Sequence, residues 1–122
     1  MLTHTEFFSS MRKTIHDRKP ELMAYFGRQV LEDCNAYARE MEGTLRASAN
    51  SDIDSKAQAV LTWNTPYAAK VYWTGKPRTE RNPLASLRWC EVARDRHGKE
   101  WREILGALLA RTLMAASSEG GQ

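Results

Sequence analysis

Residues 20–41, PELMAYFGRQVLEDCNAYAREM, decide the fold because they carry the most regular hydrophobic pattern in the chain. Their apolar positions recur at intervals of three or four residues: Met23, Phe26, Val30, Cys34, Tyr37 and Met41. That spacing places them on one face of an α-helix. We therefore expect a helix over 20–42. Gly43 would end it, because glycine readily takes the left-handed conformation that follows many helices.

A second helix is expected on the N-terminal side of this stretch. Residues 5–18 have an amphipathic pattern, and Thr5 is a candidate N-cap. Pro20 predicts a break between the two helices, because the residue before a proline is disfavoured in the helical conformation.

The C-terminal part is also expected to be helical. Asn82 and Pro83 form a cap and first-turn pair that opens a helical pattern over 83–116. The pattern fades in 117–122, which we expect to be a flexible tail.

Between residues 44 and 75 the helical period gives way to alternation. Residues 45–49 and 57–64 are predicted as two short strands of a hairpin, followed by an aromatic segment and a polar loop at 76–82. Trp63 falls on the inner face of the second strand. The expected fold is a single α+β domain over 1–122, with a long N-terminal helix and C-terminal helices packed on a small antiparallel sheet.

The charge distribution is mildly basic in the C-terminal part only. The chain has 122 residues and a net charge of +3, from 18 Lys and Arg against 15 Asp and Glu. Residues 1–75 carry nine charges of each sign, and 76–122 carry nine basic against six acidic residues. A protein that binds DNA through its phosphates usually has a denser stripe of basic residues than this one. The charge is compatible with DNA near the protein, but we do not expect specific DNA binding.

Composition also bears on compartment and covalent chemistry. The longest strongly apolar stretch has seven residues, 104–110, against the roughly 20 that span a membrane, and the N-terminal residues do not resemble a secretion signal. We expect a cytoplasmic protein without a membrane anchor. Cys34 and Cys90 lie 56 residues apart without a Cys-x-x-Cys pattern, and we expect both to be reduced core residues.

No catalytic, metal or cofactor site is predicted from the residues. The histidines His4, His16 and His97 have no partner at metal-ligand spacing, and we expect them to be solvated or capping. Asp52 and Asp54 are expected to serve a turn and not a cation, because further oxygen ligands are missing nearby. No phosphate-binding loop or nucleophile motif is present.

An ordered set of motifs covers residues 30–110. It runs through the segments 43–48, 63–68, 72–76 and 82–83. Its main positions are Gly43, Leu45, Ser48, Pro66, Tyr67, Ala68, Trp73, Gly75, Trp89 and Trp101. This set resembles the minor capsid protein family of tailed bacteriophages and Gram-positive prophages, which is similar to phage tail-completion and neck proteins.

The resemblance implies a non-enzymatic virion protein at the head-tail junction, made in the host cytoplasm. Implied partners are the portal or adaptor protein and the tail tube or terminator, with a ring of copies in the virion and a monomer in solution. We expect the partner surfaces to include the 76–82 loop and the 50–56 hairpin tip. Candidate interface residues are Lys76, Arg78, Arg81, Asp52 and Asp54.

Two other function classes are compatible with parts of the sequence. A small basic nucleic-acid-binding regulator would use residues 76–102, where cations and aromatic residues are interleaved. A small hydrolase or toxin would need a nucleophile and a base that the sequence does not assemble. The residues therefore favour a protein that binds other proteins.

Overall fold

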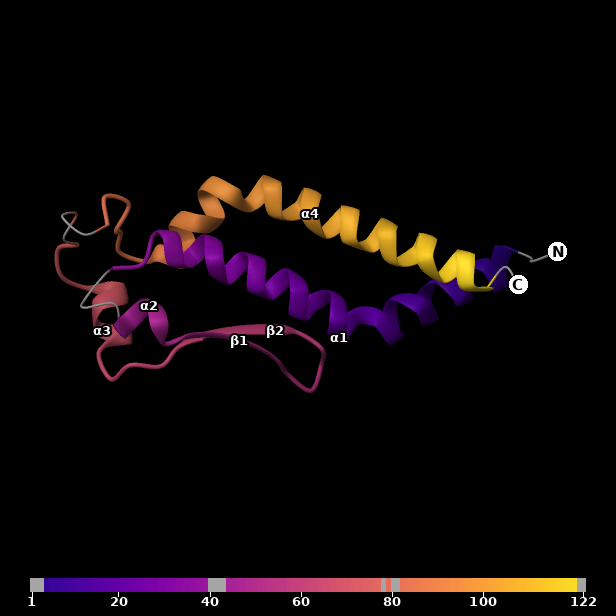
Figure 1. Cartoon of the computed structure of the whole chain (residues 1–122), viewed down its shortest axis with the longest axis horizontal. Coiled ribbons are helices and arrows are strands. Elements are labelled where there is room, and N and C mark those ends of the chain that lie inside the picture. The colour runs from indigo at the N-terminus through magenta and orange to yellow at the C-terminus, as the bar shows by residue number, and fades with distance from the viewer. Residues whose placement is uncertain (1–3, 40–43, 78, 80–81, 121–122) are drawn as a thin grey trace.

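The computed structural model describes residues 4–39, 44–77, 79 and 82–120. Its elements are α1 (His4–Ala36), α2 (Thr44–Ala47), β1 (Ala49–Ile53), β2 (Ala59–Trp63), α3 (Ala68–Trp73) and α4 (Trp89–Gly120). The expected α+β class, with long N-terminal and C-terminal helices and a small antiparallel sheet, is confirmed. The molecule is elongated, with the start of α1 and the end of α4 far from α3 (Figure 1).

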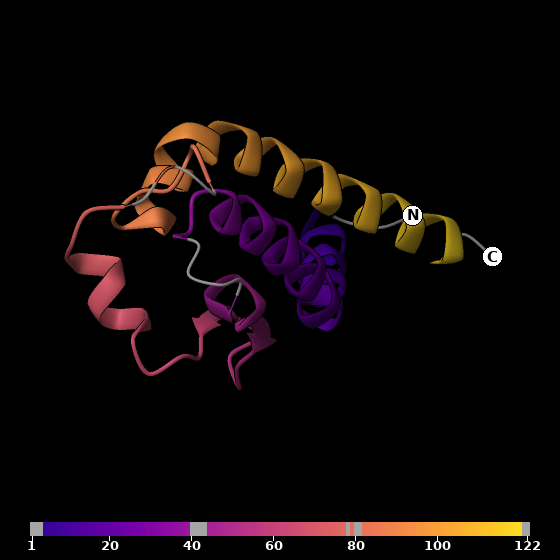
Figure 2. The same ribbon diagram turned by 60° about the vertical axis from the view of Figure 1, so that its left-hand side comes forward.

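Helix α1 is the central layer of the molecule. The hairpin packs on one side of α1 and α4 packs on the other (Figures 1 and 2). The sequence predicted both long helices on one sheet face, and this placement of α4 is wrong. Two strands about 4.8 Å apart make a surface only about as wide as one helix, so α4 packs on α1 instead.

Helix α1 runs through the predicted break at Pro20 and ends earlier than expected, at Ala36 and not at 42. Half-buried apolar side chains, including Ile15 and Leu22, continue past the proline along the helix that packs with α4. This packing outweighs the one hydrogen bond that proline removes. The helix bends within its N-terminal half (Figure 1), as proline predicts. The expected helix terminator, Gly43, lies outside the described residues.

The hairpin is confirmed, but its first strand is shifted from the prediction. Residues 44–47 form α2, and β1 pairs with β2 in a register that joins Ala49 to Trp63 and Ile53 to Ala59. Both strands alternate half-buried and exposed side chains, which confirms the inward face of β2. The polar residues at 50–53, which suggested a turn, lie in β1 because alternate burial is compatible with a polar outer face.

The hairpin turn is made by residues 54–58. Asp54 Oδ1 accepts hydrogen bonds at 2.9 Å from the backbone N–H groups of Lys56 and Gln58. The Asp54 carboxylate therefore organises the turn, as expected of an aspartate at this position.

Helix α4 begins at Trp89, six residues later than predicted, and runs without interruption to Gly120. The predicted flexible tail is thus helical as far as it is described. Several alanines near this end, which are the best helix formers, account for its continuation. None of the helices in the described part of the chain is both long and apolar enough to cross a bilayer.

The buried core lies at the α3 end of the molecule. Its members come from the end of α1 and the residues just after it, from α2 and α3, and from the start of α4: Cys34, Tyr37, Ala38, Leu45, Ala68, Val71, Trp89 and Ala93. Beyond this core, α1 and α4 continue as a two-helix arm made of residues 4–26 and 94–120. None of the arm side chains that the structure describes is fully buried.

Candidate interaction site at the aromatic end

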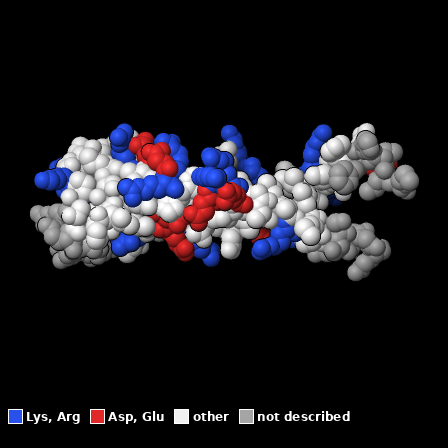
Figure 3. All heavy atoms as spheres, turned by 90° about the horizontal axis from the view of Figure 1, so that it is seen from above, with Lys and Arg blue, Asp and Glu red and all other residues white. Residues whose placement is uncertain are grey.

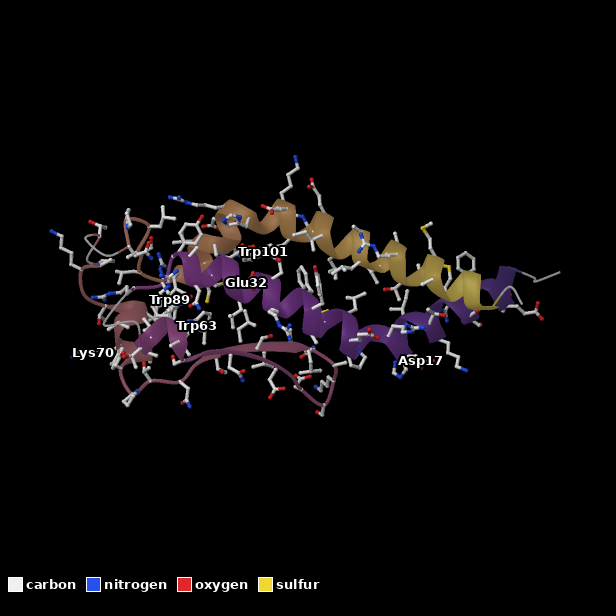
Figure 4. The ribbon with its side chains drawn as sticks, viewed as in Figure 1. Asp17, Glu32, Trp63, Lys70, Trp89 and Trp101 are labelled. Atoms are coloured by element: carbon white, nitrogen blue, oxygen red, sulfur yellow. The ribbon has the colours of Figure 1, made fainter. Side chains whose placement is uncertain are left out.

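Four aromatic rings form a row from the core to the surface, which we call the aromatic row. Trp63 contacts Trp89 at a centroid distance of 5.8 Å, Trp89 contacts Tyr72 at 4.6 Å, and Tyr72 contacts Trp73 at 5.0 Å. All three pairs are edge-to-face, a geometry worth about 0.5–1.5 kcal/mol each beyond burial. Trp63 and Trp89 lie side by side in Figure 4.

The two ends of this row differ sharply in exposure. Trp89 is 1% exposed, whereas Trp73 is 59% exposed. Large exposed aromatic rings are the residues that most often anchor protein interfaces. Trp73 is therefore the first candidate for contact with a partner.

Trp63 is fixed from the side of α1 by Asn35. The Trp63 Nε1–H donates to Asn35 Oδ1 at 2.8 Å, and Asn35 Nδ2 donates to the Arg46 carbonyl at 3.1 Å. In turn, Arg46 Nε–H donates a hydrogen bond to the Asn35 carbonyl at 3.0 Å. Asn35 thus joins α1, α2 and β2 behind the aromatic row.

Helix α3, which carries Trp73, is held at its C-terminus by Arg39. The Arg39 guanidinium donates to the carbonyls of Val71 at 3.1 Å and Thr74 at 2.8 Å, and to Lys76 at 3.3 Å. A cation at this end also complements the helix dipole. Trp73 is consequently displayed on a fixed backbone, which lowers the entropy lost when a partner binds.

Gly75 permits this arrangement. Its φ of +88° lies in the left-handed region, and a Cβ there would come within 3.1 Å of Arg39 Nη1. Glycine takes this backbone conformation without steric cost, so Gly75 allows the turn into the following loop.

Asn82 was predicted to cap the helix that follows it, but its side chain binds the end of α1 instead. Its side chain is buried, and Nδ2 donates to the carbonyls of Ala36 at 3.0 Å and Ala38 at 2.9 Å. It therefore satisfies carbonyls at the C-terminal end of α1 and is not the N-cap of α4. Asn82 Oδ1 accepts from the Leu84 N–H at 3.1 Å, which orients the chain entering α4.

The described charged side chains of the segment 64–88 are all basic: Lys70, Lys76 and Arg88. Lys70 is exposed at the outer side of α3 (Figure 4), three residues before Trp73, and Lys76 is exposed after Gly75. The predicted interface residues Arg78 and Arg81 lie outside the described residues.

The remaining predicted positions divide into core and surface. Leu45 and Ala68 are buried, Ser48, Tyr67 and Trp101 are half-buried, and Pro66 is exposed. Asp52 in β1 and Asp54 at the hairpin turn are exposed, and this turn lies away from α3 (Figure 1). Among the described side chains, no three His, Cys, Asp or Glu come together as a metal site.

A polar cluster between α1 and α4 was missed by the sequence reasoning. Tyr37 Oη and His97 Nε2 are 2.8 Å apart, and His97 Nδ1 lies 3.4 Å from Glu100 Oε2. His97 was expected to be solvated or capping, and this is wrong, because its side chain is 27% exposed and bonded across the interface. Tyr37 is only 6% exposed, so its hydroxyl ties the helices together instead of facing a substrate.

Beside this cluster, the Trp101 Nε1–H donates to Asp33 Oδ2 at 2.7 Å. The His97 and Trp101 rings stack with centroids 6.4 Å apart. No local motif distinguishes Asp33, Asn35 or Arg39 from solvated polar residues, because each has its side-chain partner at least eleven positions away.

Comparison of the chain with protein-family models, with curated proteins and with solved structures finds no match. The function is therefore proposed from the chain's own residues and geometry.

Proposed function

We propose that this protein is a structural component of a tailed bacteriophage or prophage particle, acting at the head-tail junction as a minor capsid, tail-completion or connector protein. The resemblance of the ordered motifs over residues 30–110 to the minor capsid protein family suggests this position in the particle. The observation that carries a binding role is the 59% exposure of Trp73 on a helix fixed by Arg39. In this proposal the protein acts by binding other proteins and not by catalysis.

The surroundings of Trp73 support a protein partner. An apolar ring flanked by Lys70 and Lys76 combines an interface anchor with charges that select an acidic surface. Proposed partners are the portal or adaptor protein on one side and the tail tube or terminator on the other.

The elongated shape suits a protein that contacts two neighbours. Helix α3, which carries Trp73, lies at one end, and the C-terminal part of α4, which carries the 71% exposed Met114, lies at the other (Figure 1). Ring closure requires two different patches on each subunit, and two separate apolar sites meet this requirement. The protein would be a monomer in the host cytoplasm and a ring in the virion.

A nucleic-acid-binding regulator is less well supported by the charges on α4. Figure 3 shows Lys and Arg interspersed with Asp and Glu on the face of the molecule that carries α4. The exposed charged residues in the first part of α4 are Arg94, Asp95, Arg96, Lys99, Glu100, Arg102 and Glu103. This mixture is typical of a solvated helix face and not of a stripe that follows a phosphate backbone.

The proposal is tested by mixing the purified full-length chain with portal, adaptor, tail-tube and terminator proteins from the same genome. We expect a stable complex with at least one of them in size-exclusion chromatography. Particles assembled without the protein should accumulate as separate heads and tails. Normal head-tail joining in its absence would contradict the proposal, and binding to DNA that weakens steeply with salt would favour the regulator.

A further inference from the structure

The exposed side of α4 changes character after Glu103. Every exposed side chain from Arg94 to Glu103 is charged. In the next stretch, residues 104–115 (ILGALLARTLMA), one residue of twelve is charged. A solvated helix normally carries charged and polar residues on its outer side, so this stretch is atypical of a surface that stays in water. Its exposed members, which we call the α4 face, are Gly106, Ala107, Ala110, Arg111, Met114 and Ala115.

The α4 face is open in the described part of the chain. Helix α1 packs on the other side of α4, where Leu105 and Leu109 are half-buried, and the hairpin lies beyond α1 (Figure 1). A Cβ at Gly106 would meet nothing within 4 Å, and Met114 is 71% exposed. A helix that is nearly apolar on all sides is normally buried by more than one neighbour, and twelve residues are too few for a bilayer span of roughly 20.

We propose that the α4 face is a self-association surface, on which α4 of a second copy of this chain packs in the antiparallel direction. The accessible area supports an occupant of this size. The chain exposes 8829 Å², whereas a compact monomer of 13.9 kDa exposes about 6,700 Å². The excess, roughly 2,000 Å², is more than the roughly 800 Å² that each partner buries in an interface of standard size.

The charges beside the α4 face favour a second copy in this direction. Glu103 lies just before the face, and Arg111 lies about two turns further along the helix. Within the described residues, neither side chain forms an ion pair. In an antiparallel pair centred near Ala107, Glu103 of each copy lies beside Arg111 of the other. Parallel pairing in register would instead bring like charges together.

The side chains at the centre of the face permit close packing. Ala107 and Ala110 each carry a single methyl group, so two helices can approach to the short end of the usual range of about 8–10 Å. Because α3 lies near the start of α4 (Figure 1), an antiparallel dimer would display one Trp73 at each of its ends.

The inference names the neighbour that binds at Met114, but it rests on the composition and exposure of α4 and not on the virion role. The monomer proposed for the host cytoplasm would be the dissociated form of this dimer. Dimerisation is measured without any neck or tail protein, so it can fail while partner binding at Trp73 holds, and the reverse.

The test measures the molar mass of the purified full-length chain over a range of concentrations by sedimentation equilibrium. We expect the mass to rise from that of one chain to that of two chains and no further. A chain that stays monomeric at the highest concentration, or that forms longer assemblies, would overturn the inference. A monomer that binds vesicles of neutral and anionic phospholipid through the α4 face would also overturn it, because the face would then belong to a membrane.

A charge at the centre of the α4 face should separate the two copies. Ala107→Glu brings two carboxylates together across the pair and should raise the dimer dissociation constant at least about 30-fold. Ala107 is exposed and glutamate is a good helix former, so the circular dichroism spectrum should not change. The matched control is Ala69→Glu, the same change at an exposed alanine of α3, which should alter the dissociation constant by less than about twofold. Equal dissociation constants in the two variants would overturn the inference.

A charge swap tests the antiparallel direction. Glu103→Arg and Arg111→Glu each replace attraction by repulsion at both ends of the pair, and each should weaken the dimer about tenfold. The double variant restores opposite charges and should dimerise within about threefold of the unaltered chain. Single variants that dimerise normally, or a double variant no tighter than either single one, would overturn the antiparallel contact.

Discussion

At the scale of single residues, the aromatic end is stabilised by polar side chains that donate hydrogen bonds to backbone carbonyls at the ends of helices. Arg39 binds the carbonyls after α3, and Asn82 binds those after α1. A buried carbonyl without a partner is costly, so these side chains fix the loops that the aromatic row packs against.

Asn82→Ala should lower the free energy of unfolding by about 1–3 kcal/mol, because the carbonyls of Ala36 and Ala38 would lose a buried donor. Urea denaturation followed by circular dichroism measures the change. The matched control is Asn64→Ala, which removes an exposed amide and should change stability by less than about 0.5 kcal/mol. Equal effects in the two variants would show that the contacts of Asn82 do not stabilise the fold.

Tyr72 should make the protein sensitive to alkali. Burial, and then the nearby Cys90 and Glu91, raise the pKa of Tyr72 from 10.0 to about 12. The unfolded chain therefore loses this proton at lower pH than the folded chain, so the stabilisation is present below pH 10 and is lost as the pH rises toward 12.

Between pH 10 and 12, the unfolding free energy of Tyr72→Phe should consequently fall less steeply than that of the unaltered chain. Urea titrations in the presence of a reducing agent measure both slopes. Parallel slopes would contradict the assigned pKa shift.

At the scale of elements, the contact between α1 and the hairpin depends on Gly27. A Cβ at this position would lie 2.8 Å from both Ala59 Cβ and Ser51 Oγ, closer than real side chains approach. The absence of a side chain at Gly27 allows β1 and β2 to lie directly on the helix, although glycine itself disfavours helical structure.

Gly27→Ala should destabilise the protein by about 1–3 kcal/mol, because the hairpin must move away from α1 and this outweighs the helix propensity gained. Gly106→Ala is the matched control, since nothing lies within 4 Å of a Cβ at that position of α4. It should stabilise the protein by up to about 1 kcal/mol. Thermal unfolding measures both, and a stabilising Gly27→Ala would refute the close contact.

Sequence periodicity predicts an element correctly when the residues that its apolar pattern places on one face are also the residues that pack against the rest of the protein. The stripe through Cys34 and Tyr37 and the alternation that ends at Trp63 were predicted correctly, because the first is buried and the second is half-buried on its inner face, as the patterns imply. The break at Pro20 was wrong because α4, a distant element, stabilises the helix on both sides of it. Local signals do not contain this information.

The candidate site was only partly predictable for a related reason. Trp73, Lys76 and Gly75 were identified from the sequence, and the structure places them around the end of α3. The residues that hold this end together, Arg39 and Asn82, act over 32 or more positions, so only the folded chain shows their role.

At the scale of the whole molecule, a compact core at one end continues into a two-helix arm at the other. The core positions the aromatic row, while the arm extends the molecule without fully burying any side chain that the structure describes. An elongated chain with α3 and its Trp73 at one end and the C-terminal part of α4 with Met114 at the other suits the bridging of two neighbours in an assembly (Figure 1).

The most direct test of the central claim, that Trp73 anchors a protein partner, is the affinity of the Trp73→Ala chain for the neck or tail protein that binds the unaltered chain, measured by calorimetry. Tyr25→Ala is the matched control, because Tyr25 is an aromatic residue of similar exposure, 61%, on α1. We predict at least about a 30-fold loss of affinity for Trp73→Ala, as for an interface hot spot, and less than about a twofold change for Tyr25→Ala. Unchanged affinity in Trp73→Ala would contradict the account.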